Sequence, residues 1–137
     1  MEDCIFCKIV SGEIPSTKVY EDDQVIVFKD LNPVAPVHDL VVPKKHYKNV
    51  MELDDSELLN HIFEVIKTVA KQENVAEDGF RIINNCGDFA GQTVKHIHFH
   101  VIGGEDLTKH VGMDHCYNYL KMVKISKNYG KCYVNIV

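Results

Sequence analysis

The sequence has 137 residues and a mass of 15.6 kDa, which corresponds to one domain of ordinary size. Apolar residues make up 45% and charged residues 26%, as is usual for globular proteins. The net charge of −5, with Arg81 as the only arginine, argues against a broad nucleic-acid surface, which needs a basic face. The sequence contains no apolar run of membrane-spanning length and no basic and apolar leader, so we expect a cytoplasmic protein that does not bind membranes.

The first third of the sequence contains all four prolines, which divide it into short elements. Glycine is favoured just past a helix end, and polar turns between apolar runs favour hairpins. We predict, in chain order, a helix over residues 4–11 ended by Gly12, strands over 18–20 and 25–29, a proline-containing loop over 30–37 and a strand over 40–42.

A long amphipathic helix is predicted over residues 56–72, with Asp54 as its N-cap because it lies three residues before Glu57. Its apolar residues recur at helical spacing, so one face should cover a sheet. Strands are expected over 80–84 and 96–102, with a glycine-containing loop over 86–93 between them. These elements predict an α+β domain: an antiparallel sheet of about five strands, one long helix packed across it and a short N-terminal helix.

Three histidines, His96, His98 and His100, alternate with apolar residues in the last predicted strand. Alternate side chains of a strand point to opposite faces, so the histidines should form a polar row while the apolar set packs on a helix. A central imidazole could attack phosphorus while its neighbours bind the oxygens, or the three rings could hold a catalytic zinc ion. Gly91, Gln92 and Thr93 precede the row and favour an anion-binding site, although the spacing alone does not decide.

Cys4 and Cys7 form a Cys-x-x-Cys pair, whose spacing suits two ligands of tetrahedral zinc. Two ligands are not a complete site, and reduced, partly buried thiols are the alternative. The other cysteines and histidines without a pattern are interpreted as structural or exposed: Cys86, Cys116, Cys132, His61, His110 and His115.

Residues 91–102, Gly-Gln-Thr-Val-Lys-His-Ile-His-Phe-His-Val-Ile, closely resemble the histidine triad motif of the HIT superfamily. Residues 35–38 (Ala-Pro-Val-His) and 42–46 (Val-Pro-Lys-Lys-His) support the resemblance, which is strongest to the Hint branch of nucleoside phosphoramidate hydrolases in its bacterial, zinc-bearing form. It implies a HIT domain over 1–104, followed by a C-terminal extension over 105–137. In that extension a helix face with Tyr117, Leu120 and Val123 and a strand over 133–137 are the expected elements.

The resemblance implies hydrolysis of purine nucleoside 5′-phosphoramidates, such as adenylated amines, to the nucleoside monophosphate through a covalent nucleotidyl-histidine. His98 matches the family nucleophile, and the backbone carbonyl of His96 would orient its ring. His100 would contact the phosphate and assist the leaving group, and His38 would complete the cluster. No catalytic metal is implied.

The resemblance also implies binding residues. Asp30 would hold the ribose hydroxyls, and the remaining nucleotide contacts are expected from two sets of residues: Ile5, Phe6, Phe28, Leu31 and Leu40 around the purine, and Asn85, Gln92 and Thr93 at the phosphate. A structural zinc ion would be held by Cys4, Cys7, His46 and His96. The family further implies a homodimer in which the two sheets meet edge to edge.

Three other functions are compatible with the sequence. The triad also supports dinucleoside polyphosphate hydrolysis in a sister branch of the family, and a nucleotide-binding adaptor could hydrolyse only incidentally. A zinc-centred module without enzymatic activity is the third. The intact nucleophile and its supporting histidines favour an enzyme, because binding alone needs no nucleophile.

Overall fold

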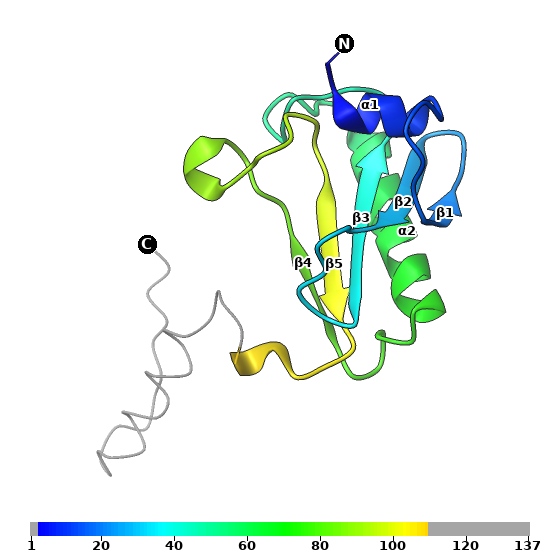
Figure 1. Cartoon of the computed structure of the whole chain (residues 1–137), viewed down its shortest axis with the longest axis vertical. Coiled ribbons are helices and arrows are strands. Elements are labelled where there is room, and N and C mark those ends of the chain that lie inside the picture. The colour runs from blue at the N-terminus through cyan, green and yellow to red at the C-terminus, as the bar shows by residue number, and fades with distance from the viewer. Residues whose placement is uncertain (1–2, 110–137) are drawn as a thin grey trace. The chain divides into compact units, whose positions relative to one another are not determined.

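The computed structural model describes residues 3–109; the predicted C-terminal helix and strand, His110, His115, Cys116 and Cys132 lie outside this range. The described residues up to Glu105 belong to one compact unit. Its elements, shown in Figure 1, are α1 (Ile5–Val10), β1 (Lys18–Glu21), β2 (Val25–Lys29), β3 (Val37–Pro43), α2 (Ser56–Gln72), β4 (Phe80–Ile83), the 3-10 turn η1 (Asp88–Ala90) and β5 (Phe99–Gly103). A second 3-10 turn, η2 (Leu107–Lys109), follows Glu105.

All five strands form one antiparallel sheet in the order β1-β2-β3-β5-β4. β5 lies between β3 and β4, with His100 opposite Leu40 and Ile102 opposite His38. The rings of His38 and His100 therefore project from the same face of the sheet, one on each of two neighbouring strands. The sheet and its two helices confirm the predicted α+β class.

The two faces of the sheet carry different layers. α2 covers one face, where its apolar stripe packs on alternate residues of three strands: Leu58, Ile62, Val65, Ile66 and Val69 against Val25, Val27, Val41, Phe99 and Val101, with Ile97. The opposite face carries a smaller cluster under α1, made of Phe6, Ile9, Ile26, Phe28, Leu40 and Val42. Figure 1 shows α1 near one end of the sheet and α2 behind the strands.

Three local predictions differ from the structure. Asp55, and not Asp54, caps α2, because its Oδ1 accepts the backbone N–H of Leu58 at 3.0 Å. β3 begins at Val37 and not at residue 40, since its pairing with β5 extends to Gly103. The histidine strand begins only at Phe99, because the N–H of Ile97 donates to the carbonyl of Tyr47 at 2.8 Å, outside the sheet ladder.

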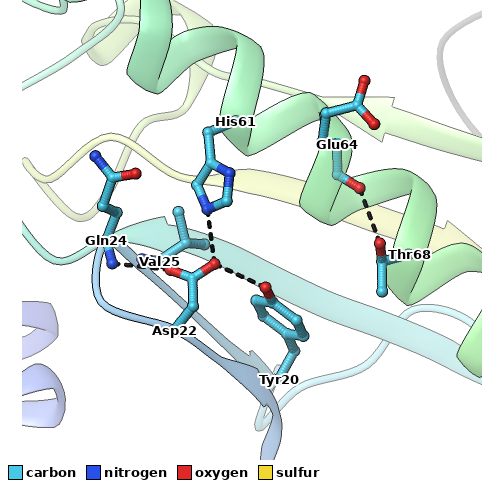
Figure 2. A network of polar contacts seen from close by, with 7 residues as sticks. All are labelled: Tyr20, Asp22, Gln24, Val25, His61, Glu64 and Thr68. Atoms are coloured by element: carbon cyan, nitrogen blue, oxygen red, sulfur yellow. Dashed lines mark hydrogen bonds and ion pairs between the residues drawn. The ribbon is translucent and has the colours of Figure 1, made fainter.

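A polar network ties the β1–β2 connection to α2 (Figure 2). Asp22 Oδ2 accepts the Tyr20 hydroxyl at 2.7 Å and lies 2.6 Å from His61 Nε2, while Oδ1 accepts two backbone N–H groups at 2.8 Å. Burial opposes ionisation of Asp22, but these hydrogen bonds outweigh it and lower its pKa to about 2. His61 is therefore a structural contact, which is one of the two roles expected for it.

Asp39 is a buried carboxylate on the α2 face of β3, where solvent does not reach its side chain. Neither oxygen has a hydrogen-bond partner, and the nearest cation, Lys29 Nζ, lies 3.7 Å away and 3.1 Å from Glu73 Oε1. Burial, together with the neighbouring Glu73 carboxylate, raises the pKa of Asp39 to about 7.

Neither α1 nor α2, nor any other helix within residues 3–109, is both long enough and apolar enough to span a lipid bilayer.

Candidate functional site

His98 is held in a single orientation by its own chain. Its Nδ1 lies 2.7 Å from the backbone carbonyl of His96, and a carbonyl can only accept. Nδ1 therefore carries the proton, and Nε2 of the neutral ring presents a lone pair. The ring is 6% exposed and meets Phe6 edge-on, with 5.0 Å between centroids. Burial lowers the pKa of His98, which keeps the imidazole neutral.

Asn84, which the sequence analysis did not single out, supports this arrangement. Its Nδ2 donates to the carbonyl of His98 at 2.8 Å and so fixes the irregular segment just before β5. The only sequence signal was an asparagine at the end of a predicted strand, a position where this residue is common for many reasons.

His100 is the opposite tautomer to His98, with its proton on Nε2, and a chain of hydrogen bonds determines this. The backbone N–H of Val34 donates to His38 Nδ1 at 3.1 Å, so the proton of neutral His38 lies on Nε2. That nitrogen lies 2.9 Å from His100 Nδ1 and 3.3 Å from Asp30 Oδ2. His100 Nδ1 accepts, and its Nε2 carries the proton.

Burial keeps this pair of rings neutral. It lowers the pKa of His38 against the opposing effect of Asp30. It also lowers the pKa of His100, together with the nearby His98 and His38 rings, to about 4. The rings of His98 and His100 are 5.1 Å apart, so the site presents a lone pair and a proton side by side.

Asp30, His38 and His100 also lie close enough together to suggest a cation site. A metal would need a lone pair on His38 Nε2 and another on His100 Nδ1. Neutral His38 has one ring lone pair, and the N–H of Val34 already occupies it. The three residues are better explained as a hydrogen-bonded relay, with Asp30 at its end.

Of the five apolar residues expected around a purine, the structure gathers three. Phe6, Phe28 and Leu40 are buried in one cluster on the histidine face, with the two phenyl centroids 5.5 Å apart. Ile5 is exposed, and Leu31 is 93% exposed, so neither belongs to that cluster. Asp30 follows Phe28 by two residues, just past the end of β2, and its Oδ1 accepts the N–H of Asn32 at 2.8 Å.

Gln92 differs from its expected role as a phosphate contact. Its buried Nε2 donates to the carbonyls of Lys48 at 2.7 Å and Val94 at 3.0 Å, and its Oε1 accepts the N–H of Gly87. Its own N–H donates to the Gly87 carbonyl. Because every donor is used inside the protein, Gln92 shapes the loop. Thr93 is exposed and Asn85 half-buried in the same loop.

The structure brings Cys4, Cys7, His46 and His96 together. His46 Nδ1 and His96 Nδ1 are 3.2 Å apart, and the three sulfur-to-nitrogen contacts measure 3.3–3.5 Å. His96 Nε2 lies 2.8 Å from the carbonyl of Pro43, to which it donates, so its Nδ1 lone pair faces the two thiols. The four side chains form a cluster that can bind a metal ion.

The donor set fits zinc. With Zn–S of about 2.3 Å and Zn–N of about 2.0–2.1 Å, a tetrahedron has edges of about 3.3 Å between nitrogens and about 3.5 Å between sulfur and nitrogen. The observed separations of 3.2 Å and 3.3–3.5 Å match these edges. Two thiolates and two imidazoles would close the coordination shell, which is typical of a structural site.

Residues 11–107 match the model of the HIT domain family. The chain belongs to the HIT family. It is 42% identical over 108 residues to the purine nucleoside phosphoramidase of Escherichia coli K12, covering 77% of this chain and 91% of that protein. It is 44% identical over 107 residues to a 14 kDa zinc-binding protein of Zea mays, covering 75% of this chain and 83% of that one.

A solved HIT-family structure agrees with this fold. The histidine triad protein from Clostridium difficile has a TM-score of 0.75 and 56% sequence identity, over 78% of this chain and 95% of that chain. The chain therefore has a HIT fold as well as a HIT-family sequence.

Proposed function

We propose that this protein hydrolyses purine nucleoside 5′-phosphoramidates to nucleoside monophosphates through a nucleotidyl intermediate on His98. The observation that carries the proposal is the opposite polarity of two adjacent rings, with a lone pair on His98 Nε2 and a proton on His100 Nε2. The phosphoramidase name of the relative from Escherichia coli supports the choice of substrate.

In the first step His98 Nε2 attacks phosphorus, and the P–N bond to the leaving amine breaks. His100 Nε2 gives its proton to that amine, which departs as a neutral molecule, because an amide anion is a poor leaving group. His100 becomes an anion as His98 becomes a cation, so the net charge of the two rings does not change. The positive charge that develops on His98 is stabilised by the hydrogen bond from Nδ1 to the His96 carbonyl.

In the second step water attacks phosphorus and the bond to His98 Nε2 breaks. His100 Nε2, now without its proton, accepts one from the water, so both rings return to their starting states. Between the two steps the anionic His100 accepts a hydrogen bond at Nδ1 from the N–H of His38 Nε2, 2.9 Å away, which stabilises the charge. Asp30 lies 3.3 Å from that same nitrogen of His38.

Nucleotide binding is assigned to the histidine face of the sheet. Asp30 would accept the ribose hydroxyls, since each carboxylate oxygen can accept more than one hydrogen bond. Phe6, Phe28 and Leu40 would form the apolar side of the purine site. Asn85 and Thr93 would contact the phosphate from the loop that Gln92 shapes.

The zinc ion would be held by Cys4, Cys7, His46 and His96 and would supply structural cross-linking between α1 and the segment before β5. The zinc-binding name of the maize relative supports this assignment.

We also propose a homodimer in which β4 of one copy meets β4 of another. In the described sheet β1 and β4 are the two edge strands, and near the β4 edge the apolar side chains of Ile82 on that strand and Phe63 on α2 are partly exposed. An apolar, unpaired strand edge is a favourable surface for sheet extension.

The test is turnover of adenosine 5′-phosphoramidate and of a diadenosine polyphosphate by the zinc-loaded wild type and by His98→Ala. We expect turnover of the phosphoramidate, a loss of several orders of magnitude in the variant, and a nucleotidyl adduct on His98 in rapidly quenched wild type. A strong preference for the polyphosphate would replace the substrate assignment. Nucleotide binding without turnover of either compound would favour the adaptor function.

A further inference from the structure

His96 joins the metal-ligand cluster to the nucleophile. Its Nδ1 faces Cys4, Cys7 and His46, and its Nε2 donates to the carbonyl of Pro43 at 2.8 Å. Its own carbonyl, at the other end of the same residue, accepts from His98 Nδ1 at 2.7 Å. The side chain is 0% exposed, so a shift of this ring in its packed surroundings would also move the carbonyl.

The sheet does not fix this carbonyl. Regular pairing between β3 and β5 starts at Val41 and Phe99, and the segment before it has bends in place of ladder hydrogen bonds. Its backbone is anchored at the N–H of Ile97, which donates to the Tyr47 carbonyl, and at the carbonyl of His98, which accepts from Asn84 Nδ2. The N–H of Ile97 and the carbonyl of His96 belong to one planar peptide unit, so the bond to Tyr47 orients that carbonyl together with the ring of His96. Tyr47 directly follows His46 in the chain, so both constraints on the carbonyl come from a cluster residue or its neighbour.

We propose that Cys4, Cys7 and His46 are positioning residues for His98: by sharing a bound zinc ion with His96, they fix the carbonyl that selects the tautomer and direction of the nucleophilic ring. The inference rests on the proposed role of His98 and adds to it a dependence on the metal cluster. The cluster then orients a catalytic group in addition to cross-linking α1 to the sheet.

The consequence should appear mainly in kcat and much less in KM. Of the residues assigned to ribose and purine binding, Asp30, Phe28 and Leu40 lie on β2, β3 and the loop between them. Only Phe6 lies on α1, between Cys4 and Cys7, and none of the four is a cluster ligand. Loss of an orienting shell around a metal ligand typically costs 10–100-fold in activity. We expect a loss of that size in kcat, with KM for adenosine 5′-phosphoramidate changed less than about threefold.

The experiment compares zinc-loaded wild type with wild type stripped by a chelator. A cavity of about 630 Å³ is lined by Cys4 and His46, among other residues, and gives a chelator access to the cluster. The direct readout is the ¹⁵N spectrum of the His98 ring, which distinguishes a proton on Nδ1 from one on Nε2. Loaded protein should show Nδ1 protonated, and stripped protein should show both tautomers, with the Nδ1 form restored by added zinc.

Two variants keep the comparison meaningful if the stripped wild type unfolds. His46→Ala retains three of the four ligands, so a folded protein with weaker zinc binding is expected. Cys86→Ser is the matched control, because Cys86 is a half-buried free thiol outside the cluster. We expect lower kcat and mixed His98 tautomers for His46→Ala, and neither change for Cys86→Ser.

An unchanged His98 spectrum and unchanged kcat, in stripped wild type or in folded His46→Ala, would overturn the inference and leave the cluster purely structural. Failure of the proposed function gives a different result: loaded wild type would show a single His98 tautomer that depends on zinc, but no turnover of the phosphoramidate.

Discussion

His38 Nε2 lies 2.9 Å from His100 Nδ1, so a histidine outside the triad determines which nitrogen of His100 carries its proton. The tautomer of His38 is in turn determined by the backbone N–H of Val34, which donates to His38 Nδ1. The proton on His100 Nε2 is thus set by the turn that precedes β3, and the lone pair on His98 by the segment that precedes β5. Two irregular segments give two chemically identical side chains opposite functions.

His100→Ala should reduce kcat/KM for adenosine 5′-phosphoramidates by about 10²–10⁴-fold, the usual contribution of a positioned general acid. The loss should be much smaller for an adenylate ester of an acidic phenol, because a phenolate departs without a proton. Steady-state kinetics with both substrates measures the difference.

His38→Ala is the informative companion to that variant. It leaves His100 in place but removes the donor to its Nδ1, so the same dependence on the leaving group should appear with a smaller amplitude. Equal losses for amine and phenol leaving groups in both variants would contradict the general-acid role of His100.

Local periodicity predicted most of the fold. The helical spacing of Leu58, Ile62 and Val65 predicted the buried face of α2, and all three are buried against the sheet. The alternation through His96–Ile102 predicted which side chains share a face, although the regular strand begins later. These features depend on residues that are close together in the sequence, so the sequence alone is enough to predict them.

Features that depend on distant partners could not be predicted in this way. Gln92 looked like a phosphate contact because its partners, the Lys48 carbonyl and the Gly87 N–H, are chosen by the tertiary fold. Asp54 and Asp55 are chemically identical, and only the course of the chain into α2 makes Asp55 the cap. The tautomer of His100 likewise follows from a backbone group in another segment, the N–H of Val34, which acts through His38.

Gln92→Ala should destabilise the protein and weaken nucleotide binding. Removing the amide leaves the buried N–H of Gly87 and the carbonyls of Lys48 and Val94 without their partner, which costs about 1–3 kcal/mol for each unsatisfied group before relaxation. We expect a loss of about 2–4 kcal/mol in urea unfolding and a raised KM. Gln72→Ala, at an exposed position in α2, is the control and should change neither quantity.

Asp22→Asn should destabilise the protein at neutral pH but not in strong acid. The pKa of Asp22 is lowered from 3.8 to about 2, so its ionised form stabilises the fold above about pH 4, and that contribution disappears as the pH falls through 2. The expected loss at pH 7 is about 1–2 kcal/mol, discounted for partial exposure of the carboxylate.

Urea unfolding of wild type and Asp22→Asn at pH 7 and pH 2.5 measures this difference, with the exposed neighbour Asp23→Asn as the control. The gap between wild type and Asp22→Asn should narrow at the lower pH, and Asp23→Asn should follow the wild type throughout. A gap of the same size at both pH values would show that the charge of Asp22 is irrelevant and that only its shape matters.

Asp39→Asn should stabilise the protein, and increasingly so as the pH rises. Burial raises the pKa of Asp39 to about 7, so the folded state binds a proton that the unfolded state has released above about pH 4. Stability from this group is therefore fully present below pH 4 and is lost as the pH rises through 7. Asparagine removes that dependence, and a gain on the order of 1–3 kcal/mol is expected at pH 8, measured by urea unfolding against exposed Asp78→Asn. A variant less stable than wild type at pH 8 would mean that Lys29, 3.7 Å away, stabilises the ionised carboxylate enough to offset its burial.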